Sequence, residues 1–185
     1  MLREQIEKYI PFNEQEMRDR QIMLHIIGSC DDYLLRSNET AHFTASAWVV
    51  NHDRSKVLLI HHNIYNAWTW TGGHADGEED LLQTALREVR EETGLANIKP
   101  VNRDIFSIEI ITVDGHIKSG RYVSSHLHLN VTYLIEADED EALHIKEDEN
   151  SAIGWFEPEK LDMLSDEKWM KELVYAKLQN KLKGE

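Results

Sequence analysis

Three glutamates that lie close together, Glu88, Glu91 and Glu92, have the residue types and spacing to do chemistry in this 185-residue chain. The apolar residues around them recur every three or four positions: Leu82, Ala85, Leu86 and Val89. This spacing is typical of an amphipathic helix, and Gly94 stands where a helix ends in a left-handed residue. The sequence therefore predicts that the glutamates lie on a helix over residues 81–93.

The helical spacing brings two of these carboxylates together. Residues four apart lie on the same side of a helix, so Glu88 and Glu92 project together from the margin of the apolar stripe. Arg87 and Glu91 form a second pair on the outer side. Glutamates in the last turns oppose the helix dipole, at a cost of roughly 0.3 to 1 kcal/mol per charge, and a bound cation would offset that cost. Carboxylate oxygens favour Mg²⁺ or Mn²⁺ over zinc, although a solvated acidic helix face is the other interpretation.

The run from Gly73 to Leu95 resembles the Nudix box, the signature of the Nudix hydrolases. The box reads Gly, five residues, Glu, seven residues, then Arg-Glu-apolar-any-Glu-Glu-any-Gly-apolar, and all nine specified positions match. A chance match in this chain is on the order of one in a million. Just before the helix, Gly72 and Gly73 lack side chains, so the backbone there can approach an ion or a phosphate closely.

The resemblance implies a metal site. Glu88 and Glu92 resemble the metal-holding glutamates of the family, and Glu91 resembles a residue that joins a second ion or acts on water. The backbone of Gly72 is a further candidate ligand. The implied cofactor is Mg²⁺ or Mn²⁺.

The resemblance also implies catalytic and supporting residues. Arg87 and Glu79 resemble the supports that orient the carboxylates through ion pairs. In many Nudix enzymes a glutamate from a loop before the final core strand reaches the metal centre, and Glu149, shortly before the predicted strand 153–156, is the candidate here. If Glu149 is instead an ordinary surface residue, the general base lies in the box, at Glu91.

Candidates for substrate contact are Trp70, His74 and His126. Tyr65 and Trp70 precede the glycines and could stack on a base, but aromatic strand residues also form cores. His74 could reach phosphate or fix its loop. His126 and His128 alternate along a predicted strand, so they face one side, either toward substrate or as an ordinary polar face. No zinc site is expected, because the ten histidines have neither a cysteine partner nor HxxxH-type spacing.

The activity implied by the resemblance is hydrolysis of a nucleoside diphosphate linked to another group X. Two alternatives remain. Isopentenyl-diphosphate isomerases share the fold but have a degraded box and use a cysteine near the position of Gly72 and Gly73, whereas the single cysteine here is Cys30. A nucleotide-sensing regulator would have a disabled box, whereas this box is complete.

Composition limits the partners. The net charge of −14, with no basic cluster, disfavours nucleic acid, and no apolar run is long enough to span a membrane. With one cysteine and no secretion signal, a cytoplasmic location is expected. The expected partner is a small diphosphate substrate.

The rest of the chain predicts an α/β fold. Residues 1–36 read as a helical extension, with a helix over 2–10, a second begun by Asn13, and a third short helical piece over 31–35. This extension could pack on the catalytic domain or form a homodimer.

Residues 42–185 read as the catalytic domain, and its predicted elements alternate between strands and helices. The predicted strands are 42–51, 56–61, 68–71, 105–113, 122–135 and 153–156. Asp80 and Gln83 predict a capping box for the box helix, Asp114 and Gly115 predict the turn between two long strands, and Ser165 predicts the start of a C-terminal helix. The expected architecture is the Nudix-type α/β/α sandwich with a mixed sheet, which the resemblance supports over roughly 42–165.

Overall fold

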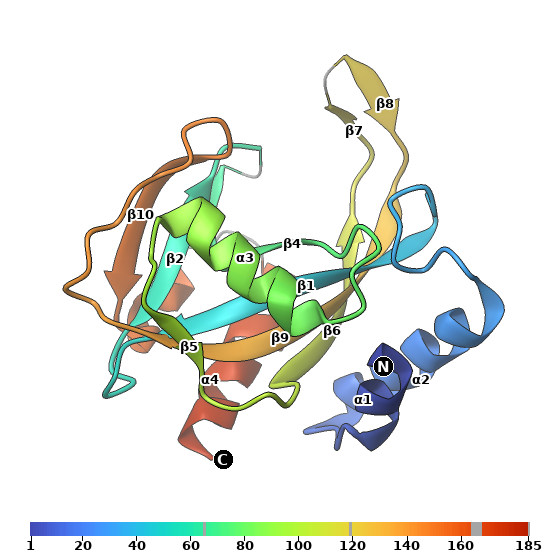
Figure 1. The fold of residues 1–185 in the computed structure, drawn as a ribbon, viewed down its shortest axis with the longest axis horizontal. Coiled ribbons are helices and arrows are strands. Elements are labelled where there is room, and N and C mark those ends of the chain that lie inside the picture. Colours follow the sequence, from blue (N-terminus) through green and yellow to red (C-terminus); the bar gives the residue numbers. More distant parts are fainter. Residues whose placement is uncertain (65, 119, 164–167, 185) are drawn as a thin grey trace.

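Strand β1 (Ala41–Val50) lies in the middle of a mixed sheet in the computed structural model, which describes residues 1–64, 66–118, 120–163 and 168–184. All ten of its residues are buried. It pairs in parallel with β9 and antiparallel with β2 and β4. The other strands of this eight-stranded sheet are β2 (Val57–His62), β3 (Ala67–Thr69), β4 (Thr71–His74), β5 (Ile98–Pro100), β6 (Ser107–Val113), β9 (His126–Ala137) and β10 (Asn150–Phe156). A small hairpin, β7 (His116–Lys118) and β8 (Arg121–Val123), projects from it (Figure 1).

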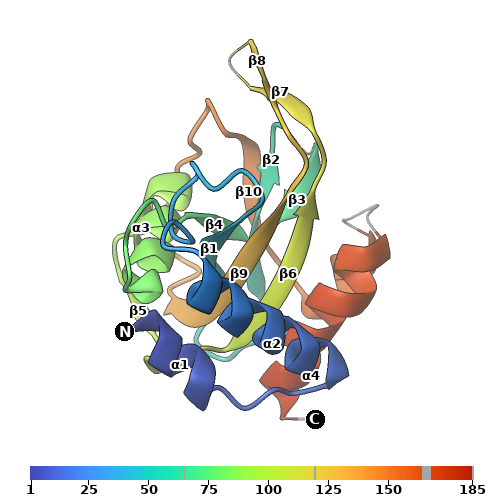
Figure 2. The same cartoon turned by 90° about the vertical axis from the view of Figure 1, so that its right-hand side faces the viewer.

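Helices cover both faces of the sheet. Helix α3 (Leu81–Thr93) lies on one side, and a π-helical segment (Met170–Tyr175) continued by α4 (Ala176–Lys183) lies on the other, as Figure 2 shows. A short 3-10 helix (Pro158–Met163) follows β10. The predicted α/β fold with a mixed sheet is therefore confirmed.

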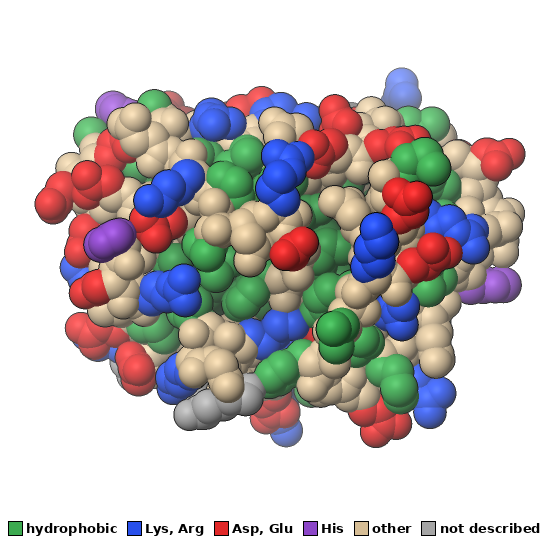
Figure 3. Space-filling view, turned by 60° about the horizontal axis from the view of Figure 1, so that its bottom comes forward, with side chains coloured by type: hydrophobic (Ala, Val, Ile, Leu, Met, Phe, Trp, Pro, Cys, Tyr) green, Lys and Arg blue, Asp and Glu red, His purple; other side chains and the backbone are tan. Residues whose placement is uncertain are grey.

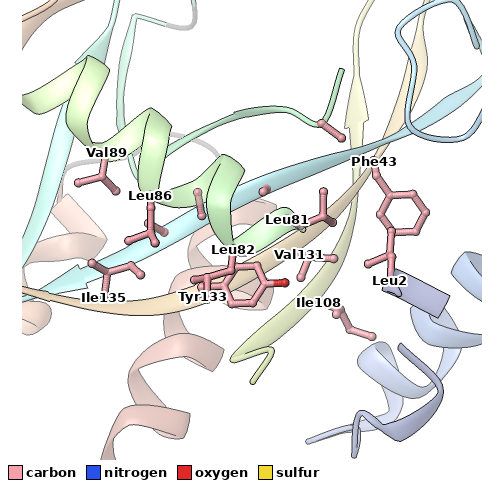
Figure 4. Packing of buried hydrophobic residues seen from close by; sticks show 14 of the residues in the cluster. Leu2, Phe43, Leu81, Leu82, Leu86, Val89, Ile108, Val131, Tyr133 and Ile135 are labelled. Carbon is pink, nitrogen blue, oxygen red and sulfur yellow. The ribbon is translucent and has the colours of Figure 1, made fainter. Parts of the chain in front are cut away.

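Alternation along β1 divides the core into two clusters. Phe43 and Ala45 pack in a cluster with the apolar side of α3, including Leu82 (Figure 4). Trp48 points to the opposite face, into a cluster with Val174 of the C-terminal helices. Odd-numbered residues of β1 therefore face α3, and even-numbered residues face away from it.

Helix α3 has the predicted bounds but not the predicted cap. Gly94 ends it in the left-handed conformation, with φ of 74°. Asp80 occupies the N-cap position, yet its side chain makes no capping hydrogen bond. Its carboxylate instead accepts a hydrogen bond from Arg103 at 3.1 Å, which replaces the capping box.

The N-terminal helices α1 (Leu2–Lys8) and α2 (Glu14–Ser29) pack on the catalytic domain, since Leu2, Ile6 and Met23 belong to the core cluster on the α3 side. Asn13 caps α2 as predicted, accepting a hydrogen bond from the Glu16 N–H at 2.9 Å. The boundary between residues 1–36 and 42–185 stays a prediction.

The predicted helical piece over residues 31–35 is wrong, because this segment forms turns. The carbonyls of Tyr33 and Leu34 accept hydrogen bonds from the backbone of Phe43 and Gly77, at 2.8 and 3.0 Å. These long-range partners replace the hydrogen bonds that a helix would make.

Two strand predictions also need correction. The predicted strand 68–71 is divided at Trp70, because β3 pairs with β2 whereas β4 pairs with β1. The turn at Asp114 and Gly115 leads into the hairpin β7–β8, so it does not join β6 directly to β9. Ser165 and Tyr65 lie outside the described residues.

No helix in the described part of the chain is long and apolar enough to cross a membrane. On the face shown in Figure 3, basic and acidic side chains are interspersed around hydrophobic ones. Basic residues do not gather into a patch on this face.

Candidate active site

Glu92 is the most deeply buried of the predicted ligands. Its side chain is only 3% exposed, and its Oε2 accepts a hydrogen bond from the Gly72 N–H at 3.0 Å. Burial raises the pKa of Glu92 to about 8, and the charges of Glu88 and Glu149 add to this effect against the opposing hydrogen bond of Gly72. The helical spacing placed Glu92 at the margin of the apolar stripe, and in the structure β4 covers this margin and buries the carboxylate.

Gly72 and Gly73 are needed for close approach. A Cβ on Gly73 would lie 2.5 Å from the carboxylate carbon of Glu88, and a Cβ on Gly72 would lie 2.7 Å from the carbonyl oxygen of Ala45. β4 can lie between β1 and the helix glutamates only because these two side chains are missing. The glycines thus place the backbone against both Glu88 and Glu92.

Two cations connect the remaining carboxylates. Arg87 lies with Nη2 3.0 Å from Glu88 Oε1 and with Nε 3.9 Å from Glu91 Oε1. Lys146 lies with Nζ 3.8 Å from Glu91 Oε2 and 3.1 Å from Glu149 Oε2. These side chains are partly exposed, so the ion pairs orient the carboxylates more than they stabilise the fold. The structure thus brings Glu149 to the glutamates of α3.

Glu79 is not brought into this group. Its side chain is exposed and takes part in none of the hydrogen bonds or ion pairs found among the described residues. Arg87, by contrast, makes the predicted contact with Glu91 and an additional one with Glu88.

The carboxylates have the donor type that a hard divalent cation prefers. Glu88, Glu91, Glu92 and Glu149 offer oxygen ligands, which suit Mg²⁺ and Mn²⁺. Burial is the largest cause of the raised pKa of Glu92, and the Gly72 N–H and the nearby Lys146 oppose it only in part, so a bound cation would favour the ionised carboxylate.

Trp70 lies away from these carboxylates. It is 7% exposed and belongs to the core cluster on the opposite face of the sheet, where its ring meets Tyr175 edge-on at 5.9 Å. This placement favours packing over substrate contact.

His74 and His126 lie in a cluster with His42 and His128, in which neighbouring ring centroids are 4.9 to 5.1 Å apart. Burial lowers the pKa of His74 to about 3 and that of His128 to about 2, so both are neutral at pH 7. His126 and His128 share one face, as predicted, with their Nε2 atoms 3.2 Å apart.

Two cations near the carboxylates were not predicted. Lys146 stands three residues before Glu149, a spacing that could have suggested the pair. Arg36 is the last residue of the predicted N-terminal extension and lies between α2 and β1, where no local pattern marks it. Its hydrogen bond with Asp76 raises the pKa of Arg36, and the charges of Glu88 and Glu149 add to this.

A model of the NUDIX domain matches residues 40–177, most of the chain. The chain belongs to the Nudix hydrolase family. The predicted family, fold type and enzyme class, that of a Nudix diphosphohydrolase, are confirmed. Nudix hydrolases generally use divalent metal ions.

Two named proteins are similar in sequence to this Nudix hydrolase. The chain is 29% identical over 129 residues to a probable DHNTP pyrophosphohydrolase of Lactococcus lactis, covering 69% of this chain and 74% of that protein. It is 31% identical over 113 residues to an asymmetrical bis(5'-nucleosyl)-tetraphosphatase of Mus musculus, covering 60% and 67%.

Solved structures show the same fold. A NUDIX hydrolase of Clostridium perfringens aligns with a TM-score of 0.55 at 22% identity, covering 77% of this chain and 96% of that one. The dihydroneopterin triphosphate pyrophosphohydrolase of E. coli aligns with a TM-score of 0.53 at 15% identity, covering 73% and 92%. At such identities the likeness concerns the fold alone.

Proposed function

We propose that this Nudix enzyme hydrolyses the diphosphate bond of a nucleoside diphosphate linked to another group, using Mg²⁺ or Mn²⁺. The observation that carries the proposal is Glu92, a buried carboxylate with a pKa of about 8 beside the carboxylates of Glu88 and Glu149. Such a group is costly to keep in the core unless a cation joins it. Glu88 and Glu92 would hold the ion, with Glu91 and the Gly72 backbone at its side.

A bound divalent ion would supply positive charge to offset that of the diphosphate and would make a water more acidic. The chain's own residues have separate tasks. Arg87 orients Glu88 and Glu91, and Lys146 holds Glu149 close to Glu91. Glu149 accepts the proton of the attacking water, a role that Glu91 takes if Glu149 does not.

Arg36 is the cation best placed to meet the substrate. It is held by Asp76, its side chain is 52% exposed, and the charges of Glu88 and Glu149 act on it. A guanidinium in this position can bind a phosphate oxygen, which the carboxylates of α3 cannot do. Direct contact of His74 and His126 with substrate stays a prediction.

The substrate class follows from the relatives as a proposal. The sequence leaves nucleotide sugars, ADP-ribose-like compounds, dinucleoside polyphosphates and (d)NTPs as candidate substrates. One relative is named for dinucleoside tetraphosphates, which belong to this list, and the other is named for dihydroneopterin triphosphate, which we add to it. All contain a phosphoanhydride that a metal and a water can cleave. Selectivity lies in residues outside the box.

The alternatives have less support. Cys30 is the residue that ends α2, in the N-terminal extension, so it does not occupy the position that an isomerase would need beside the glycines. A regulator without activity would not require Glu149 to join the glutamates of α3. A cytoplasmic homodimer stays a prediction that sedimentation of the full chain and cell fractionation would check.

The test is a panel of these diphosphates assayed with Mg²⁺ and with Mn²⁺, with release of phosphate or nucleoside monophosphate as the readout. We expect at least one to be hydrolysed only with added metal, and we expect Glu92→Gln to reduce the rate strongly. Glu147→Gln, in the same loop as Glu149 but exposed, is the control that keeps the parent rate. Tight binding of a panel member without hydrolysis would favour the regulator.

A further inference from the structure

Four imidazoles from three strands meet on one face of the sheet. In the paired strands His42 of β1 lies opposite His128 of β9, and His74 of β4 lies opposite Thr44. His126 precedes His128 by two positions on β9. Even-numbered residues of β1 face away from α3, so the cluster lies on the face opposite the helix that carries Glu88 and Glu92.

Backbone carbonyls fix two of these rings. His42 Nδ1 lies 2.9 Å from the carbonyl oxygen of Asn38, and His126 Nδ1 lies 2.8 Å from that of Ser124. A carbonyl oxygen only accepts hydrogen bonds, so both Nδ1 atoms carry a proton, and in the neutral form of each ring Nε2 keeps a lone pair. A hydrogen bond from the far nitrogen to a carbonyl is also how metal-binding histidines are oriented in proteins.

The Nε2 atom of His42 is buried without a partner among the described residues. Leaving such an atom unpaired costs about 1–3 kcal/mol. His42 is itself only 4% exposed, and it is surrounded by the other three imidazoles of the cluster. A ligand that accepts its lone pair would remove this cost.

The distances suit a transition-metal ion. Two nitrogens bound at about 2.0–2.1 Å to one tetrahedral ion stand roughly 3.3 Å apart, and the Nε2 atoms of His126 and His128 are separated by 3.2 Å. Ligand atoms of His42, His74 and His128 all lie within 4.8 Å of one another. Small side-chain rotations would bring these three inward to ligand distance.

We propose that His42, His74 and His128, with His126 as a fourth ligand, form a binding site for a transition-metal dication of the Zn²⁺ class. Neutral imidazoles suit Zn²⁺, Ni²⁺, Cu²⁺ or Fe²⁺ and do not suit Mg²⁺, which needs oxygen ligands. The site is therefore chemically distinct from the carboxylate site on the other face. A bound ion would fix β4 to β1 and β9 just after Gly73, the glycine that lies against Glu88.

The surroundings keep the ligands available. Burial disfavours a charged ring at His42 and at His128, and the hydrogen bond between the Nε2 atoms of His126 and His128 requires that the His128 proton shift from Nε2 to Nδ1 when Nε2 coordinates. The positive charges of Arg36 and Lys118 oppose the binding of a cation at the cluster, whereas the negative charge of Asp76 favours it. Asp76 is paired with Arg36, so imidazole coordination must supply most of the affinity.

The experiment measures metal uptake by the full chain after treatment with a chelator. Zn²⁺ is titrated by calorimetry in excess Mg²⁺, which saturates the carboxylate site, and Co²⁺ is added separately to record its ligand-field spectrum. We expect one tightly bound Zn²⁺ per chain and a Co²⁺ spectrum of nitrogen coordination. His128→Gln and His74→Asn should each weaken binding about 100-fold or more, since losing even an outer partner of a ligand costs about 10- to 100-fold.

Two controls separate this site from other sources of binding. His25→Gln removes an exposed imidazole of α2 and should bind Zn²⁺ as the parent does. Glu92→Gln should also keep the Zn²⁺ affinity. Circular dichroism of each variant checks its fold, and the Co²⁺ spectrum of the parent requires no variant. Equal Zn²⁺ affinity in the parent, His128→Gln and His74→Asn would overturn the proposal, as would uptake that depends on Glu92 alone.

Discussion

The Nζ of Lys146 lies 3.1 Å from the carboxylate of Glu149, and the same ammonium reaches Glu91 at 3.8 Å. One lysine thus connects a loop carboxylate to the box helix. Without it, two partly exposed glutamates would repel each other where a water must be activated.

Glu149→Gln should lower kcat much more than it changes KM, by about 10²- to 10⁴-fold, because the water loses its proton acceptor. The acidic limb of the pH profile should also flatten, since that limb reports protonation of the base. Steady-state kinetics across pH, on the best substrate of the panel, measures both effects. Unchanged kcat at every pH would move the base to Glu91.

Gly73→Ala should lower the activity measured at each Mg²⁺ concentration while leaving the fold intact. The new Cβ would lie 2.5 Å from the carboxylate carbon of Glu88, so this side chain must move. A displacement near 1 Å at a reacting site costs about 10²-fold in rate. Gly154→Ala is the matched control, because its Cβ would meet only the Phe156 ring, at 3.4 Å. Activity titrated with Mg²⁺ gives the comparison, and similar titration curves for both variants would show that Glu88 tolerates the shift.

The box helix was predictable because its determinants are local. Its apolar spacing, the stop at Gly94 and the position of Glu88 all lie within a few turns of chain. The burial of Glu92 was not predictable, since it depends on β4 lying across the helix. The turns over residues 31–35 were missed for a similar reason, because their carbonyls are satisfied by Phe43 and Gly77.

The histidine cluster shows the same limit more clearly. Spacing along the chain showed only that His126 and His128 share a face, and it gave no sign of His42 or His74 as their neighbours. That neighbourhood comes from the parallel register of β1 with β9 and the antiparallel register of β1 with β4. A rule based on local zinc-ligand spacing therefore cannot detect a site assembled across three strands.

Glu16→Gln should destabilise the whole domain by about 3–5 kcal/mol, because it leaves Lys181 without its carboxylate partner and leaves Lys177 with Glu109 alone. Glu16 is fully buried, and its carboxylate lies 3.4 Å from Lys177 and 2.9 Å from Lys181. Burial alone would raise the pKa of Glu16, but the two cations, together with hydrogen bonds from Tyr9 and the Phe12 N–H, lower it. The pairs join α2 to α4.

The measurement for Glu16→Gln is urea unfolding, and Glu14→Gln is its control. Glu14 is exposed and pairs with Arg18 at 3.8 Å, so its loss should cost under about 1 kcal/mol. Similar unfolding midpoints for the two variants would mean that the N-terminal extension adds little to the stability of the domain.

The free energy of unfolding of the metal-free protein should decrease as pH rises, because of the carboxyl group of Glu92. Its folded pKa of about 8 lies above the ordinary value of 4.5, so the folded state binds a proton that the unfolded state has lost. The stabilisation by that proton is complete below pH 4.5 and disappears as pH rises through 8. One pKa step corresponds to about 1.4 kcal/mol, so the total is on the order of a few kcal/mol.

The window for this measurement is pH 7 to about 8.5, above the ordinary histidine pKa of about 6.5. Below it, the lowered pKa values of His74 and His128 act in the opposite direction, since acid favours the unfolded state, in which these rings protonate. Thermal unfolding without metal should show a melting temperature that decreases across this window, and saturating Mg²⁺ should reduce the decrease by stabilising the ionised carboxylate. Glu92→Gln should remove the slope, whereas Glu91→Gln, at a more exposed position on the same helix, should keep it. A slope that is identical in the parent and in Glu92→Gln would show that Glu92 is already ionised in the folded metal-free protein.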